Sequence, residues 1–344
     1  DRTVGRNLIT AFGHAGLEVE LASRLRSRTP RPDDQTLGNL KARAAEEIDR
    51  LSRQWAAKPP DLWFTYHLYY KAPDLIGPAI AQKFGIPYVV AEASHAEKRL
   101  RGPFAEMAGM AMSAIQNAQA VLYVTTPDHL GLQRIVPAER LHHLPPFTPA
   151  PPGPPPRNRN DGRPARMLAV GMMRPGDKTD SYALLAKALH HTGSRNWYLD
   201  VVGDGVTLQQ VKGFFAPFGS RVRFLGQIGA DRFPAIFQPY DFQVWPAVNE
   251  AYGMTLLDGL MQGLPVVAGA EGGVPDIVSH GETGLLSPRR DAAKLGHNID
   301  CMVRCPQLQN RLAHQAWRVT RNRHSVGATA TTLGKLVTDL CRSF

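Results

Sequence analysis

The chain has 344 residues, of which 43% are hydrophobic and 20% are charged, and its formal net charge at pH 7 is +10. This length exceeds what one hydrophobic core usually supports, so we expect two domains. No apolar run reaches the roughly 18 residues of a membrane-spanning helix, so the sequence excludes such a helix. Only three cysteines occur, which argues against a disulfide scaffold and favours a reducing compartment, the cytoplasm.

The first segment of the chain has helical spacing. Residues 3–16 predict a helix interrupted by polar side chains, which does not resemble a signal peptide. Because a doubly wound domain usually opens with a central strand, we infer that an opening strand lies upstream of Asp1. The alternative is a domain whose order begins at the helix.

Strand-length apolar runs then alternate with helical stretches. In the first half we expect strands at 17–22, 61–67, 86–93 and 120–125, with helices at 37–56 and 72–84. Residues 144–164 are dense in proline and lack a core pattern, which is typical of an inter-domain linker. After this stretch, strands are expected at 166–171, 197–203, 221–226, 241–246 and 264–269.

This alternation predicts an α/β protein of two Rossmann-like, doubly wound domains that face each other across a cleft. We assign 1–148 to an N-terminal domain and 149–165 to a proline-rich linker. We assign 166–325 to a second, C-terminal domain. Residues 326–344 form a last helix that we expect to pack back on the first domain.

Two carboxylates flank the start of one short predicted helix. Glu250 follows the strand at 241–246, Gly253 opens the helix, and Asp258 lies about five residues into it. The unpaired amides of a first helical turn bind phosphate, and here they belong to Gly253, Met254 and Thr255. Either acid alone would be an ordinary surface residue; together they predict hydroxyl acceptors on both sides of a bound diphosphate.

The surrounding motifs follow a recognisable order. They are LAVG at 168–171, VVGDG at 201–205, VRFLG at 222–226, NEAYGMTLLDG at 249–259, GLPVVAG at 263–269, EGGVPDIV at 271–278 and HGETGLLSP at 280–288. In this order they resemble glycosyltransferase family 4, retaining enzymes of the GT-B fold. GIPYVVAEASH at 85–95 extends the resemblance, more loosely, into the first domain.

The resemblance implies a basic pair that neutralises the departing diphosphate. The family has arginine directly after the glycine of its VGR motif, whereas this chain reads VGMMRPGDK at 170–178, so Arg174 is displaced and Lys178 follows. Ordinary surface bases on a loop are the alternative for both. The second family acid is glutamate, one methylene longer than Asp258.

The resemblance also implies that residues 1–148 form the acceptor-side domain and residues 166–325 the nucleotide-sugar-binding domain. His95 matches a family histidine near the transferred sugar, and His67 is a weaker candidate of the same kind. Catalytic roles are therefore expected for His95, Glu250, Arg174 and Lys178. Donor binding is expected for Arg174, Lys178, Glu250, Tyr252, Gly253, Met254, Thr255 and Asp258.

The expected function is transfer of a sugar from a UDP- or GDP-linked donor to a glycan, lipid-linked or small-molecule acceptor, with retention and with neither metal nor cofactor. The alternatives are a non-catalytic nucleotide- or glycan-binding protein, and a sugar-nucleotide epimerase of the same fold.

The positive charge of the chain bears on its partners. Its bases are scattered, without a long basic run or an aromatic platform, so we expect no nucleic-acid partner. Lys98, Arg99 and Arg101 precede an apolar stretch rich in Phe and Met, a composition compatible with weak peripheral contact at the inner membrane surface. A basic loop followed by a core helix is the favoured alternative.

Overall fold

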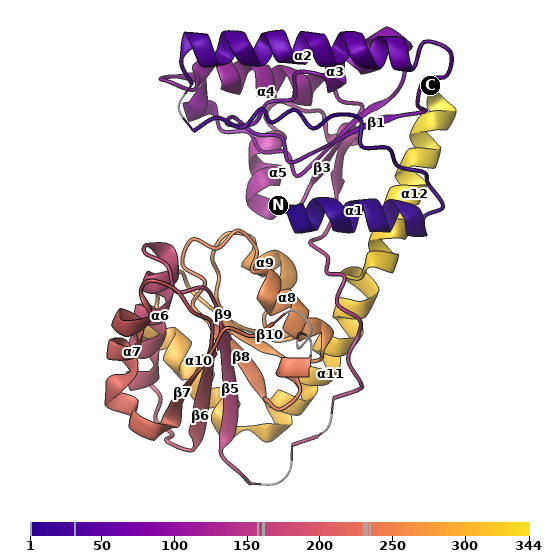
Figure 1. Ribbon diagram of the computed structural model, residues 1–344. Helices are drawn as coiled ribbons and strands as arrows, with labels where there is room; N and C mark the ends of the chain where they lie inside the picture. Colours follow the sequence, from indigo (N-terminus) through magenta and orange to yellow (C-terminus); the bar gives the residue numbers. More distant parts are fainter. Residues whose placement is uncertain (1, 31, 157, 160–161, 230–232, 234) are drawn as a thin grey trace. The chain divides into compact units, whose positions relative to one another are not determined.

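The computed structural model describes residues 2–30, 32–156, 158–159, 162–229, 233 and 235–344. The chain forms two compact units, each with its own parallel sheet (Figure 1). The first unit comprises residues 1–145 and 329–344, and the second comprises residues 146–328. None of the described helices combines the length and the apolar character needed to cross a bilayer.

The sheet of the first unit has four parallel strands in sequence order: β1 (Trp63–Tyr66), β2 (Tyr88–Ala91), β3 (Ala120–Tyr123) and β4 (Leu141–His143). Its helices are α1 (Arg2–His14), α2 (Asp34–Gln54), α3 (Gly77–Phe84), α4 (Ala105–Asn117) and α5 (Thr126–Leu132). Local sequence sets the helix starts, since Asp33 accepts from the Thr36 amide at 2.7 Å and thereby caps α2.

The strand predicted at 17–22 is wrong, because these described residues form neither helix nor strand. Val19 is 41% and Leu21 is 65% exposed, so the alternating pattern has no core to face. The segment lies along α2 instead, where Arg50 donates to the Ala22 carbonyl at 2.7 Å. An alternating pattern makes a strand only where a neighbouring strand is available. Conversely, the short β4 was not predicted.

The sheet of the second unit has six parallel strands: β5 (Ala165–Val170), β6 (Trp197–Val202), β7 (Val222–Gly226), β8 (Phe242–Trp245), β9 (Val266–Gly269) and β10 (Gly284–Ser287). They lie in the order β10-β9-β8-β5-β6-β7. The helices are α6 (Asp177–His190), α7 (Leu208–Phe215), α8 (Met254–Met261), α9 (Val274–Ile277), α10 (Ala292–Arg304) and α11 (Pro306–Arg323). The direction of winding reverses between β5 and β8, as in doubly wound folds.

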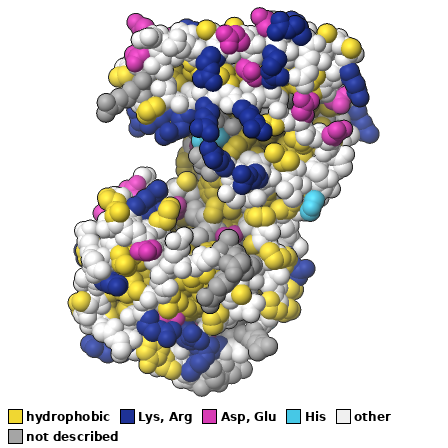
Figure 2. Space-filling model, viewed as in Figure 1, with side chains coloured by type: hydrophobic (Ala, Val, Ile, Leu, Met, Phe, Trp, Pro, Cys, Tyr) yellow, Lys and Arg dark blue, Asp and Glu magenta, His cyan; other side chains and the backbone are white. Residues whose placement is uncertain are grey.

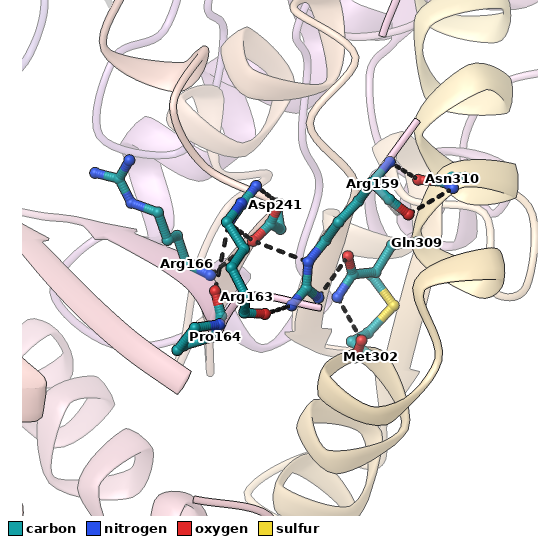
Figure 3. Close-up of polar contacts among 8 residues, drawn as sticks. All are labelled: Arg159, Arg163, Pro164, Arg166, Asp241, Met302, Gln309 and Asn310. Carbon is teal, nitrogen blue, oxygen red and sulfur yellow. Dashed lines mark hydrogen bonds and ion pairs between the residues drawn. The ribbon is translucent and has the colours of Figure 1, made fainter. Parts of the chain in front are cut away.

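The proline-rich stretch belongs to the second unit over its described residues. Arg159 is only 8% exposed and binds α11: its amide donates to Asn310 Oδ1 at 2.8 Å, and its Nη1 donates to Gln309 Oε1 at 3.1 Å (Figure 3). Residues 157, 160 and 161 of the predicted linker lie outside the described residues.

The end of the same stretch is fixed to the sheet. Arg163 donates through both terminal nitrogens to Asp241, at 2.9 and 2.7 Å, in a bidentate pair (Figure 3). Asp241 also accepts from the Arg166 amide at 2.7 Å. Because Asp241 directly precedes β8 and Arg166 lies in β5, this carboxylate joins the two strands at the reversal of the sheet.

The last helix, α12 (Val326–Ser343, yellow in Figure 1), contributes its residues from Thr329 onward to the first unit, as expected. Leu333 is fully buried. A Cβ built on Gly334 would lie 3.2 Å from the Ala15 Cβ, so the helix lies against the end of α1. The chain therefore leaves the first unit once and returns to complete it.

Candidate functional site

The candidate site lies at the carboxyl ends of β5 and β8. These neighbouring strands are followed by loops that lead in different directions, one into α6 and the other into α8. Open parallel sheets bind ligands in the crevice that such a reversal creates. The described residues around it include the predicted basic pair, both predicted acids and the predicted phosphate-binding helix start.

Lys178 and Glu250 meet at this point. Lys178 Nζ donates to Glu250 Oε2, and the Trp245 indole Nε1 donates to the same oxygen at 3.3 Å. The ammonium also lies 5.4 Å from the centroid of the Trp245 ring, in cation–π geometry. Each side chain of the ion pair is 18% exposed, so the pair is largely withdrawn from water yet open to a ligand.

The loop that carries Glu250 has a strained backbone. Ala247 and Asn249 have φ values of 61° and 50°, in the left-handed region that non-glycine residues rarely adopt. The loop is tied to α6, since Val248 N donates to Ser181 Oγ at 3.0 Å and Asn249 Nδ2 donates to Asp177 Oδ2 at 2.8 Å. Strain held by such contacts clusters at functional sites.

The helix that follows begins as the sequence predicts. Gly253 caps α8 with a φ of 73°, and its carbonyl accepts from the Leu256 amide at 2.9 Å. The amides of Met254 and Thr255 therefore occupy the first turn, where a helix offers no internal acceptor. Such donors, together with the helix dipole, favour an anion at this position.

A glycine pair supports the Glu250 loop from the β9 side. Gly272 has a φ of 48°, and a Cβ built on it would lie 2.0 Å from the Glu250 carbonyl oxygen, so only glycine allows this approach. Gly273 N donates to the Ala251 carbonyl at 2.5 Å. The pair thus serves loop geometry.

Glu271, directly before the glycine pair, was not singled out from sequence. It is 1% exposed, and its Oε2 accepts from Arg289 Nε at 3.0 Å. An acid immediately before two glycines was the available signal. Its carboxylate anchors the segment that supports Glu250.

Arg174 and Asp258 have other partners than the Lys178–Glu250 pair. Arg174 is exposed, and its carbonyl accepts from Thr179 Oγ1 at 2.8 Å. Asp258 Oδ1 accepts from Thr148 Oγ1 at 2.5 Å. Burial raises the pKa of the Asp258 carboxyl, and the Thr148 bond opposes that shift. Contact of Asp258 with a ribose remains a prediction.

The two predicted histidines lie in the first unit. Burial lowers the pKa of His95, which favours a neutral imidazole near pH 7. His67 follows β1 and lies 3.3 Å, Nδ1 to Oε1, from Glu92. Sequence analysis missed Glu92, although an acid directly after a buried strand was a usable signal. No group of three or more potential metal-ligating side chains was found among the described residues.

The fold places the chain in the GT-B class. It is similar to HepE of Anabaena in complex with UDP, with a TM-score of 0.68 and 16% identity over 89% of this chain and 84% of that one. It is also similar to sucrose-phosphate synthase from Thermosynechococcus elongatus, with a TM-score of 0.66 and 19% identity over 93% and 83% of the two chains. These similarities confirm the predicted fold class.

The sequence itself also matches a known family and several of its relatives. Residues 164–304, within the second unit, match the family described as glycosyl transferases group 1, which confirms the resemblance drawn from the motifs. The chain is 32% identical over 119 residues to a D-inositol 3-phosphate glycosyltransferase of Corynebacterium efficiens, covering 35% of this chain and 28% of that protein. It is 33% identical over 88 residues to a sulfoquinovosyl transferase of Arabidopsis thaliana, covering 25% and 17%. The chain thus spans less than a third of these curated relatives.

Proposed function

We propose that the protein is a retaining, metal-independent glycosyltransferase that moves a sugar from a nucleotide-diphosphate sugar to an acceptor. The observation that carries this proposal is the Lys178–Glu250 pair, which lies beside the start of α8 at the reversal of the sheet. A cation and an acceptor of hydroxyl hydrogen bonds are the groups that a sugar diphosphate needs. The family match over residues 164–304 supports the same class.

A UDP-linked donor is the first choice. HepE, which shares the fold, has been crystallised with UDP, with UDP and glucose, and with UDP-glucose. In this proposal the amides of Gly253, Met254 and Thr255 hold the diphosphate, with Tyr252 beside them. Asp258 accepts from the ribose hydroxyls.

Glu250 accepts hydrogen bonds from the sugar, and Lys178 and Arg174 offset the charge that develops on the departing diphosphate. The bond between the anomeric carbon and the diphosphate oxygen breaks, and its electron pair stays on that oxygen. The acceptor hydroxyl attacks from the same face and passes its proton to the departing phosphate oxygen, so the anomeric configuration is retained. His95, as a neutral imidazole, binds hydroxyls of the sugar or the acceptor.

A cytoplasmic location belongs to the same proposal, supported by three free cysteines. The acceptor is a glycan, a lipid-linked molecule or a small molecule, and peripheral contact with the inner membrane surface would accompany the lipid-linked case. No nucleic-acid partner is included.

The competing function is binding without turnover. It is favoured by the Thr148–Asp258 bond and by Met172, 57% exposed where the family has arginine. The deciding experiment incubates the protein with UDP-glucose and other UDP- and GDP-sugars in the absence of acceptor. Release of nucleoside diphosphate and free sugar supports the transferase. Binding without release supports the binding protein, and an isomerised donor identifies an epimerase.

A further inference from the structure

The beginning of the proline-rich stretch is bound to α8, the helix whose start is the candidate phosphate site. Thr148 Oγ1 donates to Asp258 Oδ1 at 2.5 Å, and Gln262 Nε2, at the end of the helix, donates to the Pro151 carbonyl at 2.7 Å. All four residues belong to the second unit. This part of the stretch therefore supports α8, and Thr148 is its contact with the predicted ribose-binding acid.

Thr148 is held in one position. It is 1% exposed, and its amide donates to the His324 carbonyl at 3.0 Å. The next residue is Pro149, which restricts the backbone of the residue before it to extended conformations. The Ala150 amide donates to Thr148 Oγ1 at 3.0 Å, so the hydroxyl hydrogen is left for Asp258. Thr148 thus donates in a single direction, toward the carboxylate.

Asp258 has one oxygen held and one oxygen open. Among the residues that the structure describes, Thr148 is the only hydrogen-bond partner of its side chain. The second oxygen, Oδ2, has no such partner and is not fully buried. Burial raises the pKa of the Asp258 carboxyl, and the Thr148 bond opposes that shift, so the bond favours the ionised form. An ionised carboxylate oriented in this way is an acceptor for a ligand hydroxyl.

Surface charge cannot read the sugar of a nucleotide. Figure 2 shows many of the lysine and arginine side chains of the visible face on the first unit. Such a surface attracts a nucleoside diphosphate, but ribonucleotides and deoxyribonucleotides carry the same charge. An oriented acceptor does distinguish them, because a missing hydroxyl leaves its hydrogen bond unmade.

We propose that Thr148 is a positioning residue that sets the preference of the protein for a ribonucleotide over a deoxyribonucleotide. Thr148 holds Asp258 Oδ1, so that Oδ2 accepts from a ribose hydroxyl of the nucleoside diphosphate. The inference rests on the proposed function, in which Asp258 accepts from the ribose. Thr148 lies 110 positions before Asp258 in the sequence and acts on the nucleotide only through that carboxylate.

Calorimetry with UDP, GDP and the 2′-deoxy and 3′-deoxy forms of each measures this preference. We expect the wild type to bind UDP or GDP about tenfold more tightly than at least one of its deoxy forms, because a hydrogen bond to a charged acceptor is lost. T148V should weaken binding of the ribonucleotide by about the same factor and leave the affinity for that deoxy form unchanged. T148S keeps the hydroxyl and should restore the wild-type preference.

A matched control and a double variant separate positioning from packing. Thr283, directly before β10, is also 1% exposed, and its Oγ1 accepts from the Ser279 amide at 2.9 Å. T283V removes this equally buried hydroxyl and should leave all affinities unchanged. In a D258A background, T148V should have no further effect on the affinity for the ribonucleotide, because Thr148 acts through Asp258.

Three results would overturn the proposal. Equal weakening of the ribonucleotide and the deoxy form in T148V would give Thr148 a structural role only. Unchanged or tighter binding of the ribonucleotide in T148V would mean that Thr148 competes with the ribose for the carboxylate. Wild-type protein that does not distinguish the two forms, or that binds none of the six nucleotides, does not read the ribose through Asp258.

Failure of this inference is distinguishable from failure of the proposed function, because the affinities are measured without turnover. Release of sugar from UDP-glucose by the wild type supports the transferase, whichever way the nucleotide affinities fall. A protein that prefers the ribonucleotide through Thr148 but releases no sugar retains the positioning role and loses the transferase proposal.

Discussion

At the residue scale, the Lys178–Glu250 pair explains how one site can hold both a sugar and a diphosphate. In the structure each charge neutralises the other, which limits the cost of partial burial. A diphosphate beside α8 would draw the ammonium toward itself and leave the carboxylate to the sugar hydroxyls. In the proposed function, the pair is therefore a preorganised site for the sugar and the diphosphate.

The first prediction concerns Glu250. E250A should lower kcat for transfer, or for donor hydrolysis, by about 100- to 1000-fold, because a group that contacts the reacting sugar is lost. The loss in unfolding free energy should be about 1–3 kcal/mol, since Lys178 and Trp245 lose an acceptor. Steady-state kinetics and urea unfolding measure the two effects. E250Q, which keeps the acceptor oxygen for Trp245, is the control for stability, and near-normal turnover in E250A would refute the role.

The second prediction concerns Asp258 and pH. Burial raises its pKa in the fold above the ordinary 3.8, and the Thr148 bond opposes this shift. The protonated Asp258 carboxyl thus makes its full contribution to stability below about pH 3.8. This contribution is lost as the pH rises through the pKa of the folded state. D258N keeps an oxygen for Thr148 without the charge, so it should melt above the wild type at pH 7, with the difference shrinking as the pH falls toward that value.

Melting curves across this pH range check the prediction, with T148V as the comparison. That variant removes the hydrogen bond and leaves the carboxylate buried, so it should melt below the wild type at pH 7. If D258N and T148V destabilise the protein equally at pH 7, the carboxylate serves chiefly as the partner of Thr148.

The sequence indicated much of the site in the second unit but not its pairings. Motif order singled out Glu250, Gly253 and Lys178. That Lys178 bonds Glu250 was not predictable, because the two residues are 72 positions apart and only the strand order brings them together. For Glu92 the sequence offered only an acid directly after a buried strand, because its left-handed backbone and its buried oxygen are properties of the fold.

At the element scale, the segment between β9 and α9 acts as a support for the loop after β8. Glu271 holds it to Arg289, Gly272 lies against the Glu250 carbonyl, and Gly273 bonds Ala251. Three consecutive residues thus position the Glu250 loop without themselves being assigned to the substrate.

The third prediction tests this support. G272A should displace the Glu250 loop, because its new Cβ would lie 2.0 Å from the Glu250 carbonyl oxygen. We expect a fall in kcat approaching that of E250A. G281A is the matched control: Gly281 has a φ of 78° but open space around its Cβ position, so the variant should cost roughly 1 kcal/mol of stability and leave kcat unchanged. Equal kinetics for the two variants would count against the supporting role.

Among the strands, those that are fully buried were predicted best from the sequence. β2, β8 and β9 are buried at every residue. β2 and β9 have no charged or amide side chain, and in β8 only Gln243 interrupts the apolar run. The strand prediction for residues 17–22 failed because their alternating apolar pattern is equally compatible with an extended segment that lies along a helix. The three-residue β4 is too short to show a period.

At the scale of the whole molecule, the first unit is discontinuous in sequence. It consists of residues 1–145 together with 329–344, which belong to one compact unit. Composition and strand–helix alternation predicted two such α/β units and a returning helix. They gave no means of placing the proline-rich stretch, whose attachment depends on Arg159 and Arg163 meeting partners distant in sequence.

The fourth prediction concerns the returning helix. Leu333 is fully buried, so L333A should lower the stability of the first unit by about 2–5 kcal/mol. Hydrogen exchange should speed up in β2 and β3 and remain unchanged in β8 and β9. K335A, at an exposed position of α12, should stay within about 0.5 kcal/mol of the wild type. Equal acceleration of exchange in both sheets would mean that α12 does not belong to the first unit alone.

The discontinuity also sets an order of events at the ribosome. Domains usually fold in turn as they leave the exit tunnel, beginning with the N-terminal one. Here residues 146–328 must be translated before the segment that contributes Leu333 becomes available. The nascent first unit therefore stays incompletely packed while the second unit is translated and folds. We expect chaperones to protect this incompletely packed intermediate.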